Sequence, residues 1–249
     1  MRIVSRVAAL AGVLVLGMVS SVTAQCPPCN NCVGDCPTQS GVQDNDVLTV
    51  AEIIKGVVDL SACPKANAPN ASAQCNGVVN VADLILASEN YEAGNCAAGP
   101  EGTTSEGATL ILGNATTCRN QQGTLTFSVD TAGGVMVDPA AVQAILAWPT
   151  DVVSVADCTM LASLEADDWY LSDRVTSNLC DYVVAFNRAG PRSITDEGDP
   201  VVLLNCDYVV KSNAPLGTHQ VTISSGLAAN LDGQAMSTTL DHGSITVCN

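Results

Sequence analysis

Apolar residues recur along this chain with two different periods, and the change between them divides it into two parts. Between residues 45 and 91 they return every three or four positions, as they do on one face of an α-helix. From residue 107 onward they come in short runs separated by Gly, Pro, Asn and Asp, a pattern typical of β-strands joined by turns. We therefore expect a multi-domain protein in which a pair of helices is followed by an all-β module.

The helical part contains an internal repeat, because residues 45–54 align with residues 76–85. In each copy a polar loop leads into an amphipathic helix. Neither helix could bury its apolar face alone, so the two copies are expected to pack on each other. The residues expected on the two apolar faces are Ile53, Ile54, Val57, Val58 and Leu60 in the first helix, and Leu84, Ile85, Ala87 and Tyr91 in the second.

The β part has a series of apolar runs that predict strands. Their alternation and the regular turn signals between them predict an antiparallel β-sandwich. The stretch from 161 to 179 fits no such pattern, and we expect a long loop there. The predicted strands span residues 108–112, 124–129, 142–148, 152–155, 182–186, 201–210, 220–224 and 244–247.

The first residues have the pattern of a secretory signal peptide. Arg2 and Arg6 flank the start of an apolar run that is too short to cross a bilayer comfortably, and small residues follow it. We expect cleavage after Ala24, which leaves a secreted or cell-surface chain with no membrane span. The predicted domains are the signal peptide at 1–24, a Cys-rich stalk at 25–34, the helical module at 35–97, a linker at 98–106 and the β module at 107–249.

The chain is strongly acidic, with a formal net charge of -16. Such a surface repels nucleic acid, which is therefore excluded as a partner. Aromatic residues make up only 3% of the sequence, so Val, Leu, Ile and Ala must build the core. This composition favours the packing of sheets over an aromatic-lined sugar cleft.

All 12 cysteines follow the predicted signal peptide, and an even number in an exported chain predicts a disulfide framework. Zinc is the competing interpretation for the closely spaced cysteines at residues 26–32. The β module holds an odd number of cysteines, so one of them pairs outside the module or stays free. Within it we expect Cys158 to pair with Cys180 and Cys118 with Cys248. The cysteines expected in disulfides are Cys36, Cys63, Cys75, Cys96, Cys118, Cys158, Cys180, Cys206 and Cys248.

Several phrases of the helical part resemble the duplicated F-hand unit of dockerin domains, including the Cys-containing kind found in exported bacterial proteins. The resemblance implies a small duplicated EF-hand-like helix pair that docks on a cohesin-like partner. It places the recognition positions at Val50 and Ala51 in the first copy, and at Val81 and Ala82 in the second. The phrases are Gly34-Asp35-Cys36, residues 48–54, Cys63-Pro64, residues 79–85 and Cys96.

The same resemblance implies calcium as the cofactor, because an EF-hand loop supplies oxygen ligands at alternate positions and an acid at position 12. Glu52 and Asp83 take position 12 of the two loops. Neither loop has an acid at position 1, although Asp35, Asp44 or Asp46 could substitute in the first. In the alternative interpretation, the cysteines have replaced calcium as the brace. The candidate ligands are Asp35, Asp44, Asn45, Asp46, Thr49 and Glu52 in the first loop, and Asn76, Asn80 and Asp83 in the second.

The β part has phrases that resemble cohesin modules, mainly in its second half. They are residues 142–155, with Trp148 in place of the usual aromatic, and residues 201–211, 214–223 and 242–247. The resemblance implies a β-sandwich of the jelly-roll type whose function is protein–protein assembly. Because cohesin-like sandwiches are close in fold to some carbohydrate-binding modules, the architecture also allows sugar binding.

No set of residues predicts catalysis. The only histidines, His219 and His242, lie far from any pattern of a hydroxyl nucleophile. We expect an exported, non-catalytic scaffold or adhesion protein that assembles through its dockerin-like and cohesin-like parts and is linked to polysaccharide degradation. The alternative is a carbohydrate-binding protein that binds polysaccharide through its β-sandwich. Trp169 and Tyr170 of an acidic loop form a candidate ligand patch, which could stack on a sugar or anchor a protein partner.

Overall fold

The computed structural model describes most of the chain that follows the predicted signal peptide and stalk. The described residues are 32–36, 41–67, 77–94, 96, 102–130, 139–187, 190, 192, 194 and 200–249. The predicted signal peptide, Cys26, Cys29, Cys75 and Asn76 lie outside them. Among the described helices, none combines the length and the apolar character needed to cross a membrane.

Most of the regular structure in the described residues is β-strand. The strands are β1 (Gly102–Leu112), β2 (Asn114–Cys118), β3 (Gln122–Asp130), β4 (Ala141–Ala147), β5 (Val153–Met160), β6 (Trp169–Thr176), β7 (Leu179–Asn187), β8 (Val201–Val210), β9 (Gly217–Ala229), β10 (Gln234–Asp241) and β11 (Gly243–Cys248). Every predicted strand overlaps an observed one, so the all-β expectation for the second part is confirmed. The sequence missed β2, β6 and β10. In addition, β6 occupies the expected long loop, and β1 begins inside the predicted linker.

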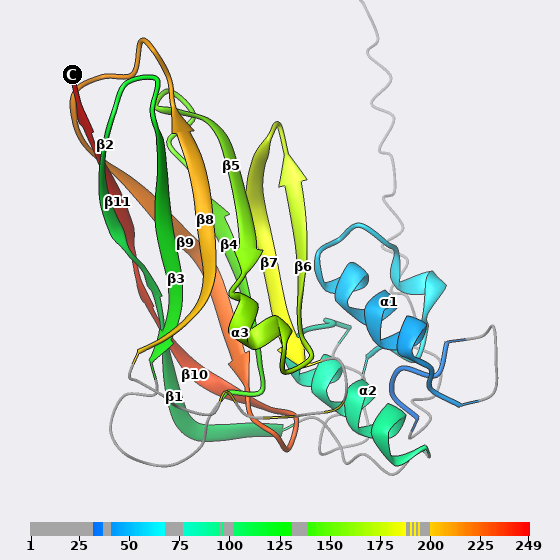
Figure 1. Ribbon diagram of the computed structural model, residues 1–249. Helices are drawn as coiled ribbons and strands as arrows, with labels where there is room; N and C mark the ends of the chain where they lie inside the picture. Colours follow the sequence, from blue (N-terminus) through cyan, green and yellow to red (C-terminus); the bar gives the residue numbers. More distant parts are fainter. Residues whose placement is uncertain are drawn as a thin grey trace, which may run out of the picture.

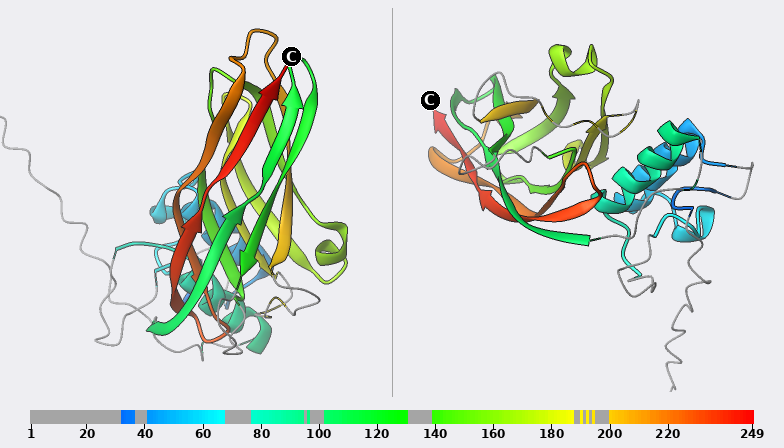
Figure 2. Two further views of the ribbon diagram at one scale, coloured as in Figure 1. Left: turned by 90° about the vertical axis from the view of Figure 1, so that its left-hand side faces the viewer. Right: turned by 90° about the horizontal axis from the view of Figure 1, so that it is seen from below.

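The strands form one sheet that closes on itself (Figures 1 and 2). Round the closed part, hydrogen-bonded neighbours follow the order β10-β1-β3-β8-β5-β7-β4-β9, and β9 pairs with β10 again. β11 and β2 continue the sheet beyond β9, while β6 pairs with β7. Among the described pairs, β1 with β10, β2 with β11 and β5 with β7 are parallel. The sheet is therefore mixed and barrel-like and not the expected antiparallel jelly-roll sandwich, because β1 and β2 near the start of the β part run parallel to β10 and β11 at its end.

The inside of the closed sheet holds a hydrophobic core of its own. Leu110 of β1 and Phe127 of β3 are fully buried there, and each such side chain stabilises the fold by about 1.5–3 kcal/mol. Tyr208 of β8 enters the same core, and its hydroxyl lies 2.6 Å from the hydroxyl of Thr117. Gly123 is required beside this pair, because a Cβ there would overlap both side chains.

The disulfides of the β module link neighbouring strands. Cys118 pairs with Cys248 at the ends of β2 and β11, as expected. The expected Cys158–Cys180 pair is wrong, because Cys158 faces Cys206 across β5 and β8, with Cα atoms 4.0 Å apart. Cys180 is a free, buried thiol, which accounts for the odd number of cysteines in this module. Burial raises the pKa of the Cys180 thiol to about 12, so it stays protonated at neutral pH.

The described helices are α1 (Asp44–Ile54), the short 3-10 helix η1 (Leu60–Ala62), α2 (Val81–Ala93) and α3 (Ala162–Glu165). α2 lies where the sequence predicts a helix. α1 lies earlier than the repeat predicts, so Val57 and Val58 are outside it and Val57 is exposed. The cause is a local cap, since Asp46 accepts a hydrogen bond from the Gln43 N–H and starts the helix at Asp44. The two sequence copies therefore have different helix boundaries, and the EF-hand-like pair is not confirmed.

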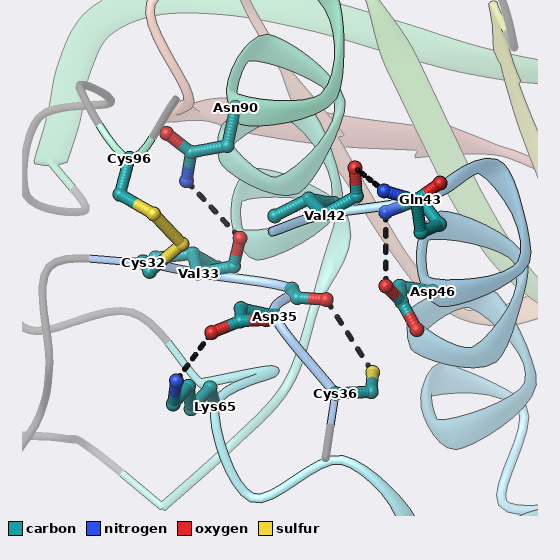
Figure 3. Close-up of a disulfide and its surroundings, with 11 residues drawn as sticks. Cys32, Val33, Asp35, Cys36, Val42, Gln43, Asp46, Lys65, Asn90 and Cys96 are labelled. Atoms are coloured by element: carbon teal, nitrogen blue, oxygen red, sulfur yellow. Dashed lines mark hydrogen bonds and ion pairs between the residues drawn. A yellow bond between two sulfur atoms is a disulfide. The ribbon is translucent and has the colours of Figure 1, made fainter. Parts of the chain in front are cut away.

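We call the described residues 32–96 the helical module and residues 102–249 the β module. Two disulfides brace the helical module, and Figure 3 shows the surroundings of one of them. Cys32–Cys96 joins its two ends, and Cys36–Cys63 closes a loop that contains α1. Val33 is buried in the core of this module, so the end of the predicted stalk belongs to it.

Candidate functional site

The helical module packs against the outer face of the β module, where α2 contacts β4, β9 and β10 (Figures 1 and 2). A second hydrophobic core fills this interface and takes residues from both modules. From the sheet come Ala141 of β4, Val184 and Phe186 of β7, and Ala229 of β9, all fully buried. These three strands therefore carry apolar residues on both faces, one toward the β core and one toward the helices.

The four predicted partner-binding residues lie in this second core. Val50, Ala51, Val81 and Ala82 are all 0% exposed. They form an apolar surface of the kind that docking requires, but the same chain covers it. The expectation of a surface open to another molecule is therefore not met in this structure.

The sheet completes the N-terminal turn of α2. The first N–H groups of a helix have no partner inside the helix. Asn80 Oδ1 accepts the Ala82 N–H at 2.7 Å, and Gln143 Oε1 of β4 accepts the Val81 N–H at 3.0 Å. A side chain of the β module thus satisfies a backbone donor that the helical module alone would leave to water.

The sheet also contacts the C-terminal end of α1, through β6. Arg174 Nη1 donates to the carbonyl of Lys55, the C-cap residue, at 2.6 Å. Lys55 Nζ donates in return to the carbonyl of Asp173 at 2.7 Å, and the lysine is only 5% exposed. The last carbonyls of a helix lack partners and carry partial negative charge, so a cation is favourable there. The two modules thus exchange reciprocal bonds to each other's backbone.

Neighbours on the sheet hold Arg174 in this position. Its Nε and Nη2 atoms donate to the two carboxylate oxygens of Asp181 at 3.0 and 3.1 Å, and its guanidinium carbon lies 5.4 Å from the centre of the Tyr182 ring. The bond to Asp181 raises the pKa of Arg174. Burial alone would raise the pKa of Asp181, but hydrogen bonds from Arg174 and Thr176 hold it below its ordinary value. Arg174 therefore reaches Lys55 as a fixed cation.

The turn between β9 and β10 approaches α2 closely. Gly233 in this turn has a φ of +64°, and a Cβ there would lie 2.5 Å from the Leu86 side chain. Asp232, which lies in this β9–β10 turn, repels the carboxylate of Glu89 in α2. Burial first, and then the charges of Asp232 and Glu92, raise the pKa of Glu89. This close approach of the turn to α2 thus has carboxylates of like charge near it.

Most predicted calcium ligands of the first loop are engaged in other contacts. Residues 44–52 are helical, so Asp44 and the residues after it do not form a loop that surrounds an ion. Asp46 caps α1, and Thr49 Oγ1 donates to the carbonyl of Asn45 at 2.8 Å. Glu52 turns toward the sheet, where its Oε1 accepts from the Ser172 hydroxyl at 3.1 Å and pairs with the Lys55 ammonium at 2.8 Å.

The other described ligand candidates have partners as well, while Asn76 lies outside the described residues. Asp35 forms an ion pair with Lys65 (Figure 3). In the second copy, Asn80 and Asp83 cap α2, where the buried Asp83 accepts the Asn80 N–H at 2.8 Å. Within the described ranges, no group of three or more His, Cys, Asp or Glu residues could hold a metal ion. The described residues do not fit a calcium-binding loop, and the Lys65 ammonium supplies the positive charge beside Asp35.

The predicted polysaccharide-binding patch does not form. Trp169 is 6% exposed and packs in the core of the β module. Tyr170, the next residue of β6, is 36% exposed and lies edge-on against Phe186, with ring centres 5.7 Å apart. Successive residues of a strand face opposite sides, so the two rings cannot stack on one sugar.

When the chain is compared with known proteins, the similarities found are to solved structures. No family model matches the sequence, and no curated protein matches it. A cohesin from Clostridium thermocellum, solved in a complex of Coh-OlpA with the dockerin Doc918, is 13% identical, with a TM-score of 0.46 over 57% of this chain and 99% of that chain. The sixth cohesin of scaffoldin B from Acetivibrio cellulolyticus, in complex with a mutant Cel5 dockerin, is 9% identical, with a TM-score of 0.46 over the same shares.

A non-cellulosomal cohesin from the archaeon Archaeoglobus fulgidus is 14% identical, with a TM-score of 0.41 over 57% of this chain and 91% of that chain. All three TM-scores are below 0.5. The function of this chain therefore has to be derived from its own contacts.

Proposed function

We propose that the protein is an exported, non-catalytic assembly protein that works by docking a helical module on the outer face of a β module. The observation that carries the proposal is the second hydrophobic core, which is built from both modules and buries the four recognition residues expected from the sequence. The site takes a helix pair of this kind as its partner. In this chain its own helical module fills it.

The disulfides support docking between two separable units. Two of the described disulfides lie inside the helical module and the other two lie inside the β module. None of these four joins the modules. Each module therefore keeps its covalent bracing when the interface opens, whereas the interface itself depends on non-covalent contacts. Disulfides in such number also fit an exported location.

The chemistry of the interface also supports a docking function. Its centre is apolar, and Gln143 and Arg174 of the sheet make hydrogen bonds at its margins. An apolar centre with a polar rim that includes an arginine is the usual anatomy of protein–protein interfaces. One phrase that resembles cohesins also falls here, since residues 142–155 contain Gln143, and the dockerin-like phrases at 48–54 and 79–85 include buried parts of α1 and α2.

Cleavage of the connection between the modules tests the proposal. A protease site is inserted between Cys96 and Gly102 of the full chain, which is folded and then cut without reduction. We expect the two fragments to co-elute in size-exclusion chromatography, because the interface holds them. Arg174→Glu should separate them, because it places a carboxylate against the Lys55 carbonyl. Fragments that separate without any substitution, while both remain folded by circular dichroism, would contradict the proposal.

Arg119 offers a matched control for the arginine. Its Nε donates to the carbonyl of Ala214 at 2.8 Å, inside the β module. Arg119→Glu therefore makes the same change of charge at the same kind of bond, but away from the helices. The cut fragments of this variant should still co-elute.

A further inference from the structure

The docking face has a polar end at β6, and we propose that this end is a subsite specific for a lysine ammonium. Its occupant is Lys55, the C-cap residue of α1, and this side chain determines which helical module the sheet accepts. The proposal rests on the proposed docking function and names the chemistry that this site recognises. Figure 1 shows β6 on the side of the β module that lies beside α1.

Lys55 is buried although it is charged. It is 5% exposed, and its ammonium has two acceptors, the Asp173 carbonyl of β6 at 2.7 Å and the Glu52 carboxylate of α1 at 2.8 Å. The first bond crosses between the modules, whereas the ion pair with Glu52 lies within the helical module. A buried cation loses its water, so it is tolerated where acceptors of this kind replace that water. The β6 carbonyl is therefore part of what makes a cation favourable at position 55.

The sheet also holds Glu52, the anion of this subsite. Ser172 of β6 is 4% exposed, and its hydroxyl donates to Glu52 Oε1 at 3.1 Å. The same oxygen pairs with the Lys55 ammonium. The sheet thus contacts both members of the ion pair, the anion through a hydroxyl donor and the cation through a carbonyl acceptor. A neutral side chain at position 55 would leave the carbonyl and the carboxylate without a cation.

The internal repeat provides a comparison within the chain. When residues 45–54 are aligned with residues 76–85, the next pair is Lys55 with Leu86. Leu86 is fully buried as well, but its side chain lies against Gly233 in the turn between β9 and β10. Burial alone therefore does not select lysine at this position of the repeat. The groups that β6 presents to the first copy select it.

The surroundings of the subsite favour lysine over arginine. An ammonium is a compact cation with three donors, whereas a guanidinium is planar and has five. Two acceptors meet the Lys55 ammonium, and Arg174 already occupies the backbone carbonyl of the same residue. A guanidinium at position 55 would therefore bury N–H groups that lack acceptors, and it would bring a second positive charge close to Arg174.

The affinity between the two fragments of the chain cut between Cys96 and Gly102 tests the subsite. We expect Lys55→Met to raise the Kd by about 10- to 100-fold, because a hydrogen bond from a charged group across the interface is lost. Lys55→Arg should raise the Kd less than Lys55→Met, because it keeps the charge. If the Lys55→Met fragments associate with the Kd of the parent, the subsite is overturned and the proposed docking function stands.

Addition of Glu52→Gln separates recognition of the ammonium from a general loss of stability. In the Lys55→Met variant the Glu52 carboxylate has lost its cation. Removal of one partner of a buried ion pair costs more than replacement of both partners by neutral groups. The double variant should therefore recover part of the lost affinity, whereas two independent structural defects would add. A double variant that binds no better than Lys55→Met alone would overturn the proposal.

Lys211 offers a matched control in the β module. Its ammonium donates to the Thr150 carbonyl at 2.7 Å, the same kind of bond at the same length as the bond from Lys55 to Asp173. Lys211→Met should leave the Kd of the fragments unchanged. An equal loss of affinity in both lysine variants would overturn the subsite, because the cause would then be the more negative charge of the chain.

The Val81 amide reports docking in the intact chain, and it guards against fragments that fail to fold. This N–H is at the first position of α2, where the helix offers it no partner, and Gln143 of the sheet accepts it. Lys55→Met should accelerate its hydrogen exchange in proportion to the weaker docking. A Lys55→Met chain whose Val81 amide exchanges at the rate of the parent would overturn the proposal independently.

Discussion

The two modules bury their apolar residues in different ways. The β module closes its sheet round a core of its own, in which Leu110, Phe127 and Tyr208 are almost completely buried. The helical module has two main helices, and its core is continuous with residues of the sheet. A unit of this size rarely supplies enough core by itself, and disulfides usually compensate. Docking is therefore part of what stabilises the helical module, as well as its proposed function.

This difference couples recognition to folding. A ligand that binds only the folded state stabilises that state in proportion to its affinity and concentration. For the helical module the sheet acts as such a ligand, held at high effective concentration. Substitutions at the interface should therefore lower the stability of the helical module more than that of the β module, which has a separate core of its own.

Removal of one disulfide from each module should produce the largest difference between the two modules in how much stability is lost. In the chain-entropy model, Cys36–Cys63 and Cys158–Cys206 each contribute about 3–4 kcal/mol. Cys36→Ser with Cys63→Ser should unfold the helical module, because its small core depends on the sheet for part of its burial. Cys158→Ala with Cys206→Ala should lower the melting temperature of the β module but leave it folded. Far-UV circular dichroism melts and limited proteolysis of α1 would measure both effects.

The opposite result would remove the contrast between the modules. A helical module that stays docked and resistant to protease without Cys36–Cys63 would mean that the sheet alone is sufficient to fold it. The β module would then have to be regarded as its folding template.

Periodicity predicted the parts of the fold that depend on local burial. Leu84 and Ile85 fall on the buried face of α2, and the runs from 124 to 129 and from 201 to 210 lie in β3 and β8. The closure of the sheet was not predictable in this way. It depends on the parallel pairing of β1 with β10, which are far apart in the sequence and carry no turn signal to specify it.

One sequence pattern indicates that the outer face of the sheet is covered. Residues 182–186 read Tyr-Val-Val-Ala-Phe, with no polar alternation, and a run of this kind indicates a strand buried on both faces. It shows that something covers the outer face, without showing what. Gln143 and Arg174 gave no signal, because their roles depend on helix ends that reach them only in the folded chain.

Loss of the Arg174 contact should have an intermediate effect. Arg174→Ala should weaken the association of the cut fragments by about 1–2 kcal/mol, or about 5- to 30-fold in Kd. We expect a value at the lower end, because the side chain is 35% exposed and water partly replaces its bonds. Isothermal titration calorimetry of the separated and remixed fragments would measure the change.

Arg119→Ala sharpens the comparison, because it removes an arginine–carbonyl bond inside the β module. It should lower the melting temperature of that module and leave the affinity of the fragments unchanged. An equal loss of affinity in both variants would mean that Arg174 acts through the general stability of the sheet.

The smallest effect should come from Glu89, whose carboxylate is subject to the negative charges of Asp232 in the β module and of Glu92 on its own helix. Its pKa is raised from 4.5 in the docked state, mainly by burial. The docked state therefore holds a proton at pH values where the undocked state has lost it. Docking should strengthen as the pH falls from neutral through the raised pKa toward 4.5, and weaken again as the pH rises. The affinity of the cut fragments, measured across this range, would show the dependence.

Glu89→Gln separates this group from others that titrate nearby. Asp46 has a raised pKa as well, chiefly from burial, and it contributes in the same direction within the helical module. Asp181 has a lowered pKa, so its contribution is retained through this range and is lost only in more acidic solution. The glutamine variant should bind more tightly than the parent at neutral pH and equally well near pH 4.5. If the two affinities differ by the same factor at both pH values, the repulsion between Glu89 and the turn of the β module does not govern docking.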